Sequence, residues 1–247
     1  MTVEQLAFIH SAFEWLAIFI GVRLYMRAGG TSLVALGKTR QFAVIFGCVV
    51  GAAIGNKLVH WLYRVDQWPL LAQSPWLILQ GQSIVGGLLG GLIGVEIGKK
   101  YAGLTESTGD RFVVPILVGL IIGRIGCFIA GLQDDTYGNP TSLPWGVDFG
   151  DGIPRHPTQL YDILFALAAL ALLRRFRPEL ARESGLQFKL MLFGYLLWRL
   201  LIDDLKPKPF TFGHGILSGI QMVCAVALFI YLRPLVLQLK RLKAHAS

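Results

Sequence analysis

The chain has 247 residues, of which 54% are hydrophobic and only 15% are charged, and its mean hydropathy is +0.57. A soluble domain carries roughly 25% charged residues, so this composition excludes an ordinary soluble protein and indicates a membrane protein. The formal net charge of +8 is spread over short patches between apolar runs, which argues against a nucleic-acid-binding protein.

Seven apolar runs approach the length of about 20 residues that a helix needs to cross a bilayer. In chain order they occupy residues 6–26, 41–62, 77–98, 112–131, 158–174, 187–203 and 215–233. The N-terminal residues lack the basic segment of a cleavable signal peptide, so we expect the first run to be a retained helix. The sequence therefore predicts an all-α integral membrane protein, with seven transmembrane helices in a single domain over residues 1–247.

The basic residues predict the orientation of these helices, because cytoplasmic loops of membrane proteins carry an excess of Lys and Arg. Fourteen basic residues flank or follow the first, third, fifth and seventh runs: Arg27, Lys38, Arg40, Lys99, Lys100, Arg111, Arg174, Arg175, Arg177, Arg182, Arg233, Lys240, Arg241 and Lys243. Four lie in loops on the opposite side: Arg64, Arg155, Lys206 and Lys208. We therefore expect a cytoplasmic C-terminus, an outer N-terminus, and an ordered extracytoplasmic loop over residues 132–157, between the fourth and fifth helices.

Glycine recurs at every fourth position in the second and third apolar runs. These glycines are Gly47, Gly51 and Gly55 in the second run and Gly86, Gly90, Gly94 and Gly98 in the third. Such stripes let helix backbones approach closely in lipid, so we expect tight packing among the second, third and fourth helices. The alternative is that some of these glycines clear space for a lipid.

The segment from Gly123 to Tyr161 concentrates polar residues in an otherwise apolar chain. Its many Gly and Pro residues set turns, so the part between the helices is expected to be a folded loop. The loop contains four aspartates: Asp134, Asp135, Asp148 and Asp151. For most of them we favour turn formation beside glycine, and proton transfer or a divalent cation is the alternative. The three cysteines lie in apolar runs without metal-ligand spacing, so the sequence predicts neither a metal site nor a disulfide.

Ionisable residues inside apolar runs cost about 2.5–3.5 kcal/mol at the bilayer centre, and they usually face a cavity or each other. His10 and Glu14 are four residues apart, so they lie on one face of the first helix. We expect this pair either to line a polar pocket near the outer surface or to pair with each other.

Three arginines come from different elements of the predicted outer half. Arg124 and Arg199 lie in the outer halves of their helices, and Arg155 stands at the outer end of the fifth helix. Guanidinium groups bind phosphate oxygens through two parallel hydrogen bonds, so this set favours an anionic phospholipid headgroup. The alternative is that Arg124 and Arg199 pair with acidic residues such as Asp162 and brace the bundle. Pro157 is expected at the first position of the fifth helix, whose free N–H groups would add to an anion site.

Four segments resemble the prolipoprotein diacylglyceryl transferases: GQSIVGGLLGG (81–91), GLIIGRIGCFIAG (119–131), GIPRHPTQLYD (152–162) and GYLLWRLLIDD (194–204). RHPTQLY is the most specific of these motifs, and the segment order together with the helix pattern covers nearly the whole chain. The resemblance implies an enzyme of the bacterial inner membrane. Enzymes of this family transfer the diacylglyceryl group of phosphatidylglycerol to the thiol of a prolipoprotein cysteine and release glycerol phosphate. No cofactor is expected.

By the same resemblance, Arg124 and Arg155 match the family's headgroup-binding arginines, and Tyr161 and Arg199 match further motif residues. Two motifs differ. The family's His-Gly-Gly reads Val85-Gly86-Gly87 here, and its Gly-Asn-Phe-x-Asn-Gly-Glu reads GCFIAGL over residues 126–132. The phospholipid-binding half is thus retained and the acceptor and proton-transfer half is changed, as in a divergent paralogue.

Because the family's histidine position holds Val85, His156 is the natural candidate for a general base, since histidine in general can gain or lose a proton near neutral pH. Asp148 or Asp151 would orient it, and the alternative for His156 is a hydrogen bond to phosphate or to the loop backbone. The expected function is transfer of a diacylglyceryl or related group from a phosphatidylglycerol-type lipid to a prolipoprotein cysteine or another acceptor. The alternative is a non-catalytic phospholipid-binding protein on the same fold. A transporter is less favoured, because no inverted repeat is visible in the sequence.

Overall fold

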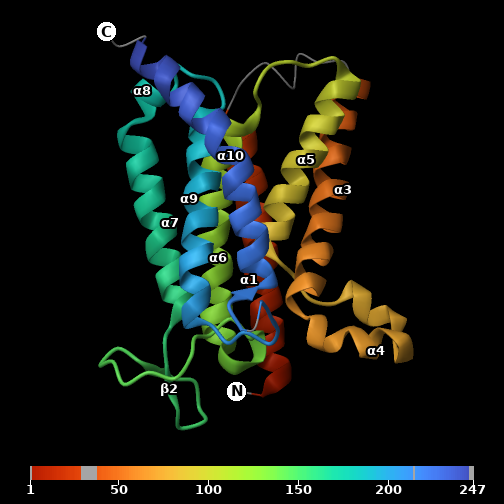
Figure 1. Cartoon of the computed structure of the whole chain (residues 1–247), viewed down its shortest axis with the longest axis vertical. Coiled ribbons are helices and arrows are strands. Elements are labelled where there is room, and N and C mark those ends of the chain that lie inside the picture. The colour runs from red at the N-terminus through yellow and green to blue at the C-terminus, as the bar shows by residue number, and fades with distance from the viewer. Residues whose placement is uncertain (1, 29–37, 214, 245–247) are drawn as a thin grey trace. The chain divides into compact units, whose positions relative to one another are not determined.

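The computed structural model describes residues 2–28, 38–213 and 215–244. Within these ranges the chain is dominated by long helices: α1 (Val3–Arg27), α3 (Lys38–Tyr63), α5 (Ile84–Ala102), α6 (Val113–Ala130), α7 (Thr158–Arg175), α9 (Leu186–Ile202) and α10 (Gly219–Ala244), shown in Figure 1. Short helical segments connect them: η1 (Val65–Gln67), α4 (Trp68–Gln73), η2 (Pro75–Leu79), η3 (Gly109–Phe112), η4 (Gly131–Asp134), α8 (Arg177–Leu180) and η5 (Asp203–Leu205). Each long helix overlaps one of the seven predicted apolar runs.

Four helical segments in the described ranges are long and apolar enough to cross a membrane: Val3–Arg27, Arg40–Tyr63, Gly109–Asp134 and Gly219–Ala244. No residue of α1 is buried inside the protein, and even its large apolar side chains are exposed: Phe8 by 75% and Trp15 by 71%. Apolar side chains on such a helix are stable when they face lipid. The all-helical character is therefore confirmed, and four helices are candidate membrane spans. Spans at α5, α7 and α9, the direction of the helices and the extracytoplasmic position of the loop between the fourth and fifth helices stay predictions.

Two helix boundaries differ from the predicted runs by more than four residues. The third run was expected to begin at residue 77, but α5 begins at Ile84, because the Ser83 hydroxyl caps it by accepting the Gly86 N–H at 3.3 Å. Gly81, with φ +69°, turns the chain just before this cap. At the other end of the chain, α10 continues through Pro234 to Ala244, eleven residues past the predicted limit.

The chain forms two compact units. Unit 1 contains Met1–Gly29, Thr108–Pro207 and Pro234–Ser247, and unit 2 contains Gly30–Ser107 and Lys208–Arg233. A single transmembrane domain over residues 1–247 stays a prediction.

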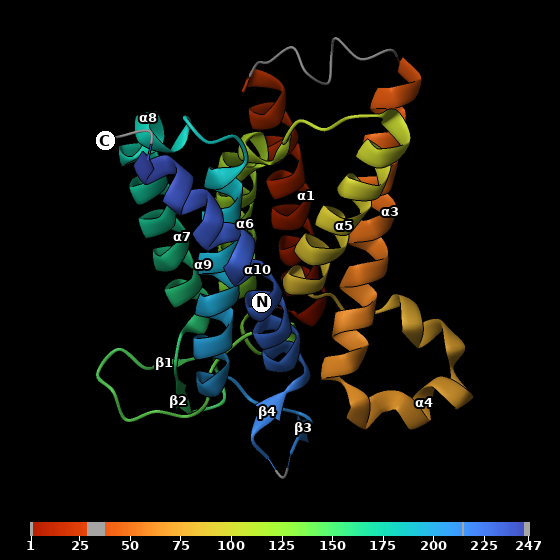
Figure 2. The ribbon, with the colours of Figure 1, turned by 45° about the horizontal axis from the view of Figure 1, so that its top comes forward.

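In unit 2 the glycine stripes of α3 and α5 face each other, and the two helices run side by side in Figures 1 and 2. A Cβ added at Gly51 would overlap the carbonyl oxygen of Gly90, and one added at Gly90 would overlap that of Gly51. The predicted close packing is therefore confirmed for the second and third helices, and for the fourth helix it stays a prediction. Lys57, which is also in α3, donates to the carbonyl of Gly81 at 2.6 Å, so this lysine of an apolar helix has a partner within the unit.

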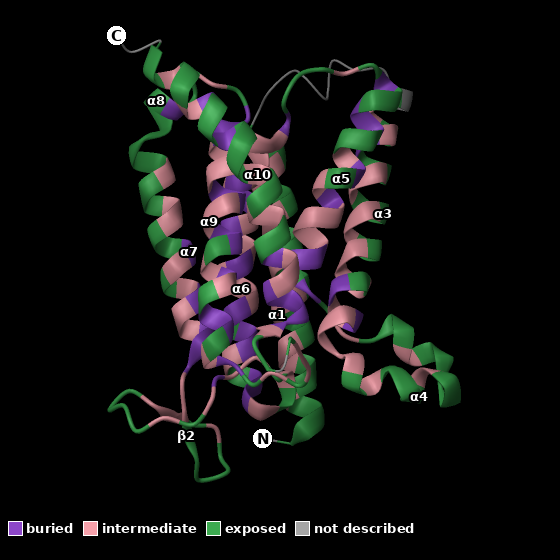
Figure 3. Ribbon diagram, viewed as in Figure 1, coloured by how far each residue is buried: buried purple, intermediate pink, exposed green. Residues whose placement is uncertain are grey.

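In unit 1, α6 packs against α1, α7 and α9. Buried residues follow one another along α6 and α9, as the colours of Figure 3 show, and Leu117, Leu192 and Leu196 are 1% exposed or less. Charged side chains lie near the ends of these helices at Ala130, Thr158 and Ile202.

The connection from α6 to α7 contains two short strands, β1 (Val147–Asp148) and β2 (Pro154–Arg155), which pair antiparallel. Oδ1 of Asp148 accepts the backbone N–H groups of Gly150, Asp151 and Gly152 at 2.8, 3.1 and 3.0 Å. The predicted turn-forming role of a loop aspartate is thus confirmed at Asp148. Pro157 was expected at the first position of α7, but it is the N-cap, and Thr158 is the first residue of the helix. An anion site at this helix N-terminus stays a prediction.

Candidate active site

A group of charged side chains is buried where α6, α7 and α9 meet in unit 1. We call it the Asp162 cluster, and it consists of Arg124, Asp162, Trp198, Arg199, Asp203 and Lys206. Oδ2 of Asp162 lies 2.9 Å from Nε of Arg124 and 3.4 Å from Nζ of Lys206. Oδ1 of Asp162 accepts a hydrogen bond from Nε1 of Trp198 at 2.8 Å. Asp162 is only 2% exposed, so it is a buried anion held by two cations and an indole.

A second ion pair of the cluster joins Arg199 and Asp203, whose Nη1 and Oδ1 atoms are 2.8 Å apart. The two residues are one helical turn apart, so the end of α9 itself brings them together. Lys206 follows η5 and is buried beside both pairs. Burial lowers the pKa of Lys206 to about 7, the Asp162 carboxylate acts against this shift, and the charge of Arg199 adds to it.

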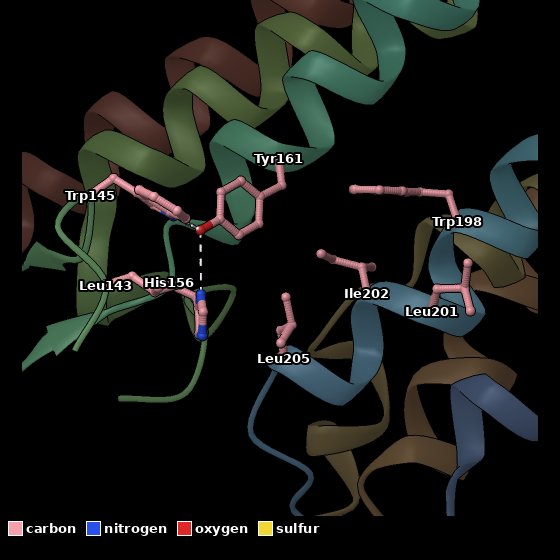
Figure 4. A pocket seen from close by; sticks show the side chains of 8 residues that line it. All are labelled: Leu143, Trp145, His156, Tyr161, Trp198, Leu201, Ile202 and Leu205. Carbon is pink, nitrogen blue, oxygen red and sulfur yellow. Dashed lines mark hydrogen bonds between the residues drawn. The ribbon is translucent and has the colours of Figure 1, made fainter. Parts of the chain in front are cut away.

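A pocket of about 500 Å³ adjoins the cluster, with α7 and its preceding loop on one side and α9 on the other (Figure 4). It is lined by Leu143, Trp145, His156, Tyr161, Trp198, Leu201, Ile202 and Leu205. Trp198 both lines the pocket and donates to Asp162, so the buried charges lie directly behind the pocket wall. A mostly apolar wall with a few polar groups suits a ligand that has an acyl chain and a polar headgroup.

The polar groups of the pocket wall are connected to one another. The Tyr161 hydroxyl lies 3.3 Å from Nδ1 of His156 and accepts the Trp145 indole N–H at 2.8 Å. Since the hydroxyl accepts from Trp145, it can donate its own proton to Nδ1 of His156. This arrangement leaves Nε2 of His156 without a hydrogen bond among the described residues.

Arg155 has a different set of partners in the loop between α6 and α7. Its Nη1 lies 2.6 Å from Oδ1 of Asp151 and donates to the carbonyl of Ile153 at 3.0 Å. Its guanidinium also stands over the Tyr137 ring, 5.2 Å from the ring centroid. The hydrogen bond from Arg155 lowers the pKa of Asp151, which makes this carboxylate a weaker base.

His10 and Glu14 pair on one face of α1, with Nε2 of His10 3.2 Å from Oε1 of Glu14. The other ring nitrogen, Nδ1, lies 3.1 Å from Oδ1 of Asp134 at the end of η4. The predicted placement of the two α1 residues on one face is therefore confirmed, and the structure adds a loop aspartate to the pair.

Comparison with known proteins gives a consistent result. Residues 7–236 match the family model of prolipoprotein diacylglyceryl transferase. Curated relatives are the phosphatidylglycerol–prolipoprotein diacylglyceryl transferases of Geobacter sulfurreducens, 31% identical over 83% of this chain and 82% of the relative, and of Bordetella parapertussis, 30% identical over 85% and 84%. The enzyme of the same name from Solidesulfovibrio magneticus is 35% identical over 67% of this chain and 63% of the relative.

The chain belongs to the prolipoprotein diacylglyceryl transferase family. The family and the long apolar helices indicate a multi-pass protein of the bacterial inner membrane. Within this family framework, the described structure brings Arg124 and Arg199 into one cluster, whereas Arg155 has its own partners in the loop. Both ion pairs are also expected under the alternative, in which Arg124 and Arg199 pair with acidic residues and brace the helix bundle.

The proposed base and its orienting residues are separated in the structure. His156 contacts Tyr161, whereas the carboxylates of Asp148 and Asp151 contact loop amides and Arg155. Among the described residues neither carboxylate contacts the His156 ring, so Tyr161 is the group that orients it.

Sequence reasoning did not single out Lys206, Trp198 or Gln159. Lys206 was counted only as a loop cation, yet it is 5% exposed and contacts Asp162. Gln159, in the first turn of α7, is fully buried, and its side-chain amide has no hydrogen-bond partner within the described part of the chain. The only signal for these three polar residues was their position in or beside the GYLLWRLLIDD and RHPTQLY motifs.

Proposed function

We propose that this protein transfers the diacylglyceryl group of a phosphatidylglycerol-type phospholipid to the thiol of a prolipoprotein cysteine or to a related acceptor. Relatives that bear the name phosphatidylglycerol–prolipoprotein diacylglyceryl transferase support this assignment of donor and acceptor. In the proposed site the Asp162 cluster binds the headgroup, and the pocket beside Trp198 receives part of the lipid.

The charge of the Asp162 cluster is the observation that carries the proposal. Its three cations, Arg124, Arg199 and Lys206, exceed its two carboxylates, Asp162 and Asp203, by one positive charge when Lys206 is protonated. An uncompensated charge in a buried site is costly. The phosphodiester of phosphatidylglycerol carries one negative charge, which would balance the cluster and favour the protonated form of Lys206, whose pKa burial otherwise lowers to about 7. A purely structural brace needs only equal numbers of cations and carboxylates.

Other buried groups suit the remainder of the headgroup. The unpartnered amide of Gln159 offers a donor and an acceptor, and leaving such a group unbonded costs about 1–3 kcal/mol. The glycerol hydroxyls of phosphatidylglycerol supply matching partners for it. Arg155, which is more accessible in the loop, would contact the phosphate by exchanging its hydrogen bond to Asp151 for one to the lipid.

The proposed transfer reaction depends on polar residues of the pocket wall. The acceptor thiol loses its proton to His156. Its sulfur then attacks the carbon of the diacylglyceryl group that is bonded to the phosphate oxygen. The carbon–oxygen bond breaks, a thioether forms, and glycerol phosphate leaves with the electron pair of that bond. Tyr161 holds the His156 ring in place through its hydroxyl, and the arginines stabilise the charge on the departing phosphate.

The test is a transfer assay with the full chain in liposomes that contain either phosphatidylglycerol or phosphatidylethanolamine. The acceptor is a peptide with a lipoprotein-type cysteine, and mass spectrometry measures its modification by a diacylglyceryl group. Transfer only from phosphatidylglycerol is the expected result. Arg124→Lys and Arg155→Lys should each lower the rate roughly tenfold to hundredfold, because loss of one charge-assisted hydrogen bond costs about 1.5–3 kcal/mol.

The matched control is Arg64→Lys, since Arg64 forms an ion pair with Asp66 in the loop after α3. This variant should keep the parent rate. Unchanged transfer in both Arg124→Lys and Arg155→Lys would contradict the headgroup assignment and favour bracing.

The altered motif residues favour a second candidate, a non-catalytic phospholipid-binding protein. Val85, which stands in place of the family's histidine, is 1% exposed and cannot transfer a proton. Cys127, Ala130 and Leu132 likewise replace the polar residues of the family motif. Binding of phosphatidylglycerol by the parent protein without transfer to any peptide or small thiol would favour this second function.

A further inference from the structure

A second cluster of potential ligands lies at the junction of α1 and the end of α6, outside the Asp162 cluster. It consists of His10, Cys127 and Asp134, and one ligand atom from each of the three lies within 4.8 Å of the other two. Nδ1 of His10 and Oδ1 of Asp134 are 3.1 Å apart. Cys127 is buried, and the other two residues are half-buried. An imidazole, a thiol and a carboxylate therefore converge from two helices and a 3₁₀ turn.

Each of these three side chains also contacts a further residue outside the cluster. Nε2 of His10 contacts Oε1 of Glu14 at 3.2 Å, which leaves Nδ1 to face the cluster. The second carboxylate oxygen of Asp134 accepts the hydroxyl proton of Thr136. Arg124 donates to the sulfur of Cys127 at 3.7 Å. A histidine between a metal and a carboxylate is a recurring arrangement, because the carboxylate fixes the ring and its tautomer.

The distances suit a small tetrahedral metal ion. Two ligands bound to zinc at 2.0–2.2 Å stand about 3.3 Å apart, and a sulfur at 2.3 Å stands about 3.5 Å from a bound nitrogen. The contact between His10 and Asp134 already has this spacing, and the thiol, which lies within 4.8 Å of both, needs to move by at most about 1.3 Å. Such a shift is within the reach of a side-chain rotation.

The donor set and its charge identify the metal. Nitrogen, sulfur and oxygen ligands together are typical of zinc, whereas magnesium and calcium prefer oxygen alone. A thiolate and a carboxylate neutralise the two positive charges of zinc, so the complex is neutral, which suits a site inside an apolar bundle.

We infer that His10, Cys127 and Asp134 bind one zinc ion, with Glu14 and Thr136 as the residues that position its ligands. Three protein ligands leave a fourth coordination position open, as in catalytic zinc sites. The sequence predicted no metal site because Cys127 and Asp134 are seven residues apart and His10 is on a distant helix, so no ligand spacing is visible along the chain. Cys127 stands where the family motif has its first asparagine.

The test is metal analysis of the purified full chain in detergent, equilibrated with zinc and then freed of loosely bound ions. We expect about one zinc per chain in the parent. Replacement of zinc by cobalt(II) should give the near-ultraviolet absorption band of a thiolate–cobalt bond, together with the visible bands of a four-coordinate ion. The cobalt spectrum of the parent alone tests thiolate ligation, even if a variant fails to fold.

Matched variants identify the ligands. Cys127→Ala should lose the metal and the thiolate band, and Asp134→Asn should lose most of the metal. Cys48→Ser removes a thiol from α3 in unit 2 and should change neither. Glu14→Gln should keep the thiolate band while its affinity for the metal falls roughly 10–100-fold.

Absence of stoichiometric metal, or a cobalt spectrum without a thiolate band, would overturn the inference. His10 would then be an imidazolium that bridges Glu14 and Asp134. Retention of the thiolate band in Cys127→Ala would overturn it as well. None of these readouts depends on the transfer reaction, so the zinc site and the proposed function can fail independently.

Discussion

At the scale of single residues, Asp162 is the buried carboxylate that contacts two cations of the site. Its two oxygens contact two cations and one indole, and all of these groups except Trp198 are less than 9% exposed. Truncating one partner of a buried pair is much more costly than its net contribution suggests, because the other charges remain buried.

Asp162→Asn should therefore lower the stability of the folded protein by roughly 3–5 kcal/mol, since Arg124 and Lys206 lose their shared carboxylate. Thermal unfolding in detergent measures this change. The matched control is Asp148→Asn, because an asparagine Oδ1 still accepts the three loop amides that Asp148 binds. Equal unfolding temperatures for the two variants would contradict a central role for Asp162.

The pH dependence of stability should include a contribution from Lys206. Its pKa is lowered from 10.5 to about 7 in the folded protein, mainly by burial. The unfolded chain therefore binds more protons between about pH 7 and 10.5, so the stability from this group rises with pH across that window and is constant below it. The charges that face Lys206 are those of Arg124, Asp162, Arg199 and Asp203.

Lys206→Met should remove this rise, because methionine has no charge to bury. Unfolding temperatures of the parent and the variant, measured from about pH 6 to 10, should diverge below pH 7 and approach each other at high pH. Lys208→Met is the control in the same loop and should follow the parent. Parallel curves for the parent and Lys206→Met would contradict the lowered pKa.

His156→Gln tests the proposed general base. Glutamine can donate a hydrogen bond but cannot carry a proton at neutral pH, so turnover should fall roughly 10²–10⁴-fold while phosphatidylglycerol binding is retained. The same transfer assay measures the rate, and a lipid-binding titration measures the affinity. His60→Gln, in α3 of unit 2, is the matched control, and unchanged turnover in His156→Gln would exclude the assignment.

At the scale of elements, the contact between α3 and α5 depends on the absence of side chains. The two stripes place backbone against backbone, so a single methyl group has no space at the contact. Neighbouring glycines on the same helix are not equivalent. A Cβ at Gly87 would lie 4.0 Å from the Cβ of Asn56, which is an ordinary contact.

Gly90→Ala should destabilise unit 2 by at least about 1–3 kcal/mol, because the added methyl forces the helices apart. Gly87→Ala is the control on the adjacent position of α5, and it should be neutral or slightly stabilising, since Ala is favoured over Gly in a helix. Loss of folded protein on heating in detergent measures the stability of both variants. Equal stability of the two variants would show that the stripe is not a close contact in the membrane.

At the scale of the whole molecule, the asymmetry of basic residues predicts the orientation in the membrane. Ser142, in the loop between α6 and α7, and Ser184, in the loop before α9, are both exposed and lie on opposite predicted sides. They form a matched pair for labelling with a thiol reagent that cannot cross the membrane.

Ser142→Cys should react in intact cells that expose the outer face of the inner membrane, whereas Ser184→Cys should react only after lysis. The parent is the control, because Cys127 and Cys224 are buried and Cys48 is half-buried. Reversed labelling would place the loop and its pocket on the cytoplasmic side and would contradict the predicted orientation.

The sequence alone determined the features that depend on neighbouring residues. Apolar length predicted the helices, the spacing of four predicted the glycine stripes and the shared helix face of His10 and Glu14, and glycine beside Asp148 predicted its turn. Each of these follows from local geometry, since 3.6 residues per turn and the preferred angles of a turn are fixed along the chain.

Only the tertiary structure decided which distant residues meet. The contacts of Asp162 with Arg124 and Lys206, and the meeting of His10 with Cys127 and Asp134, join separate helices. Such contacts depend on how each helix is rotated about its axis and shifted along its neighbour. Those two quantities are set by side-chain packing over the whole interface, so no spacing within a single segment reveals them.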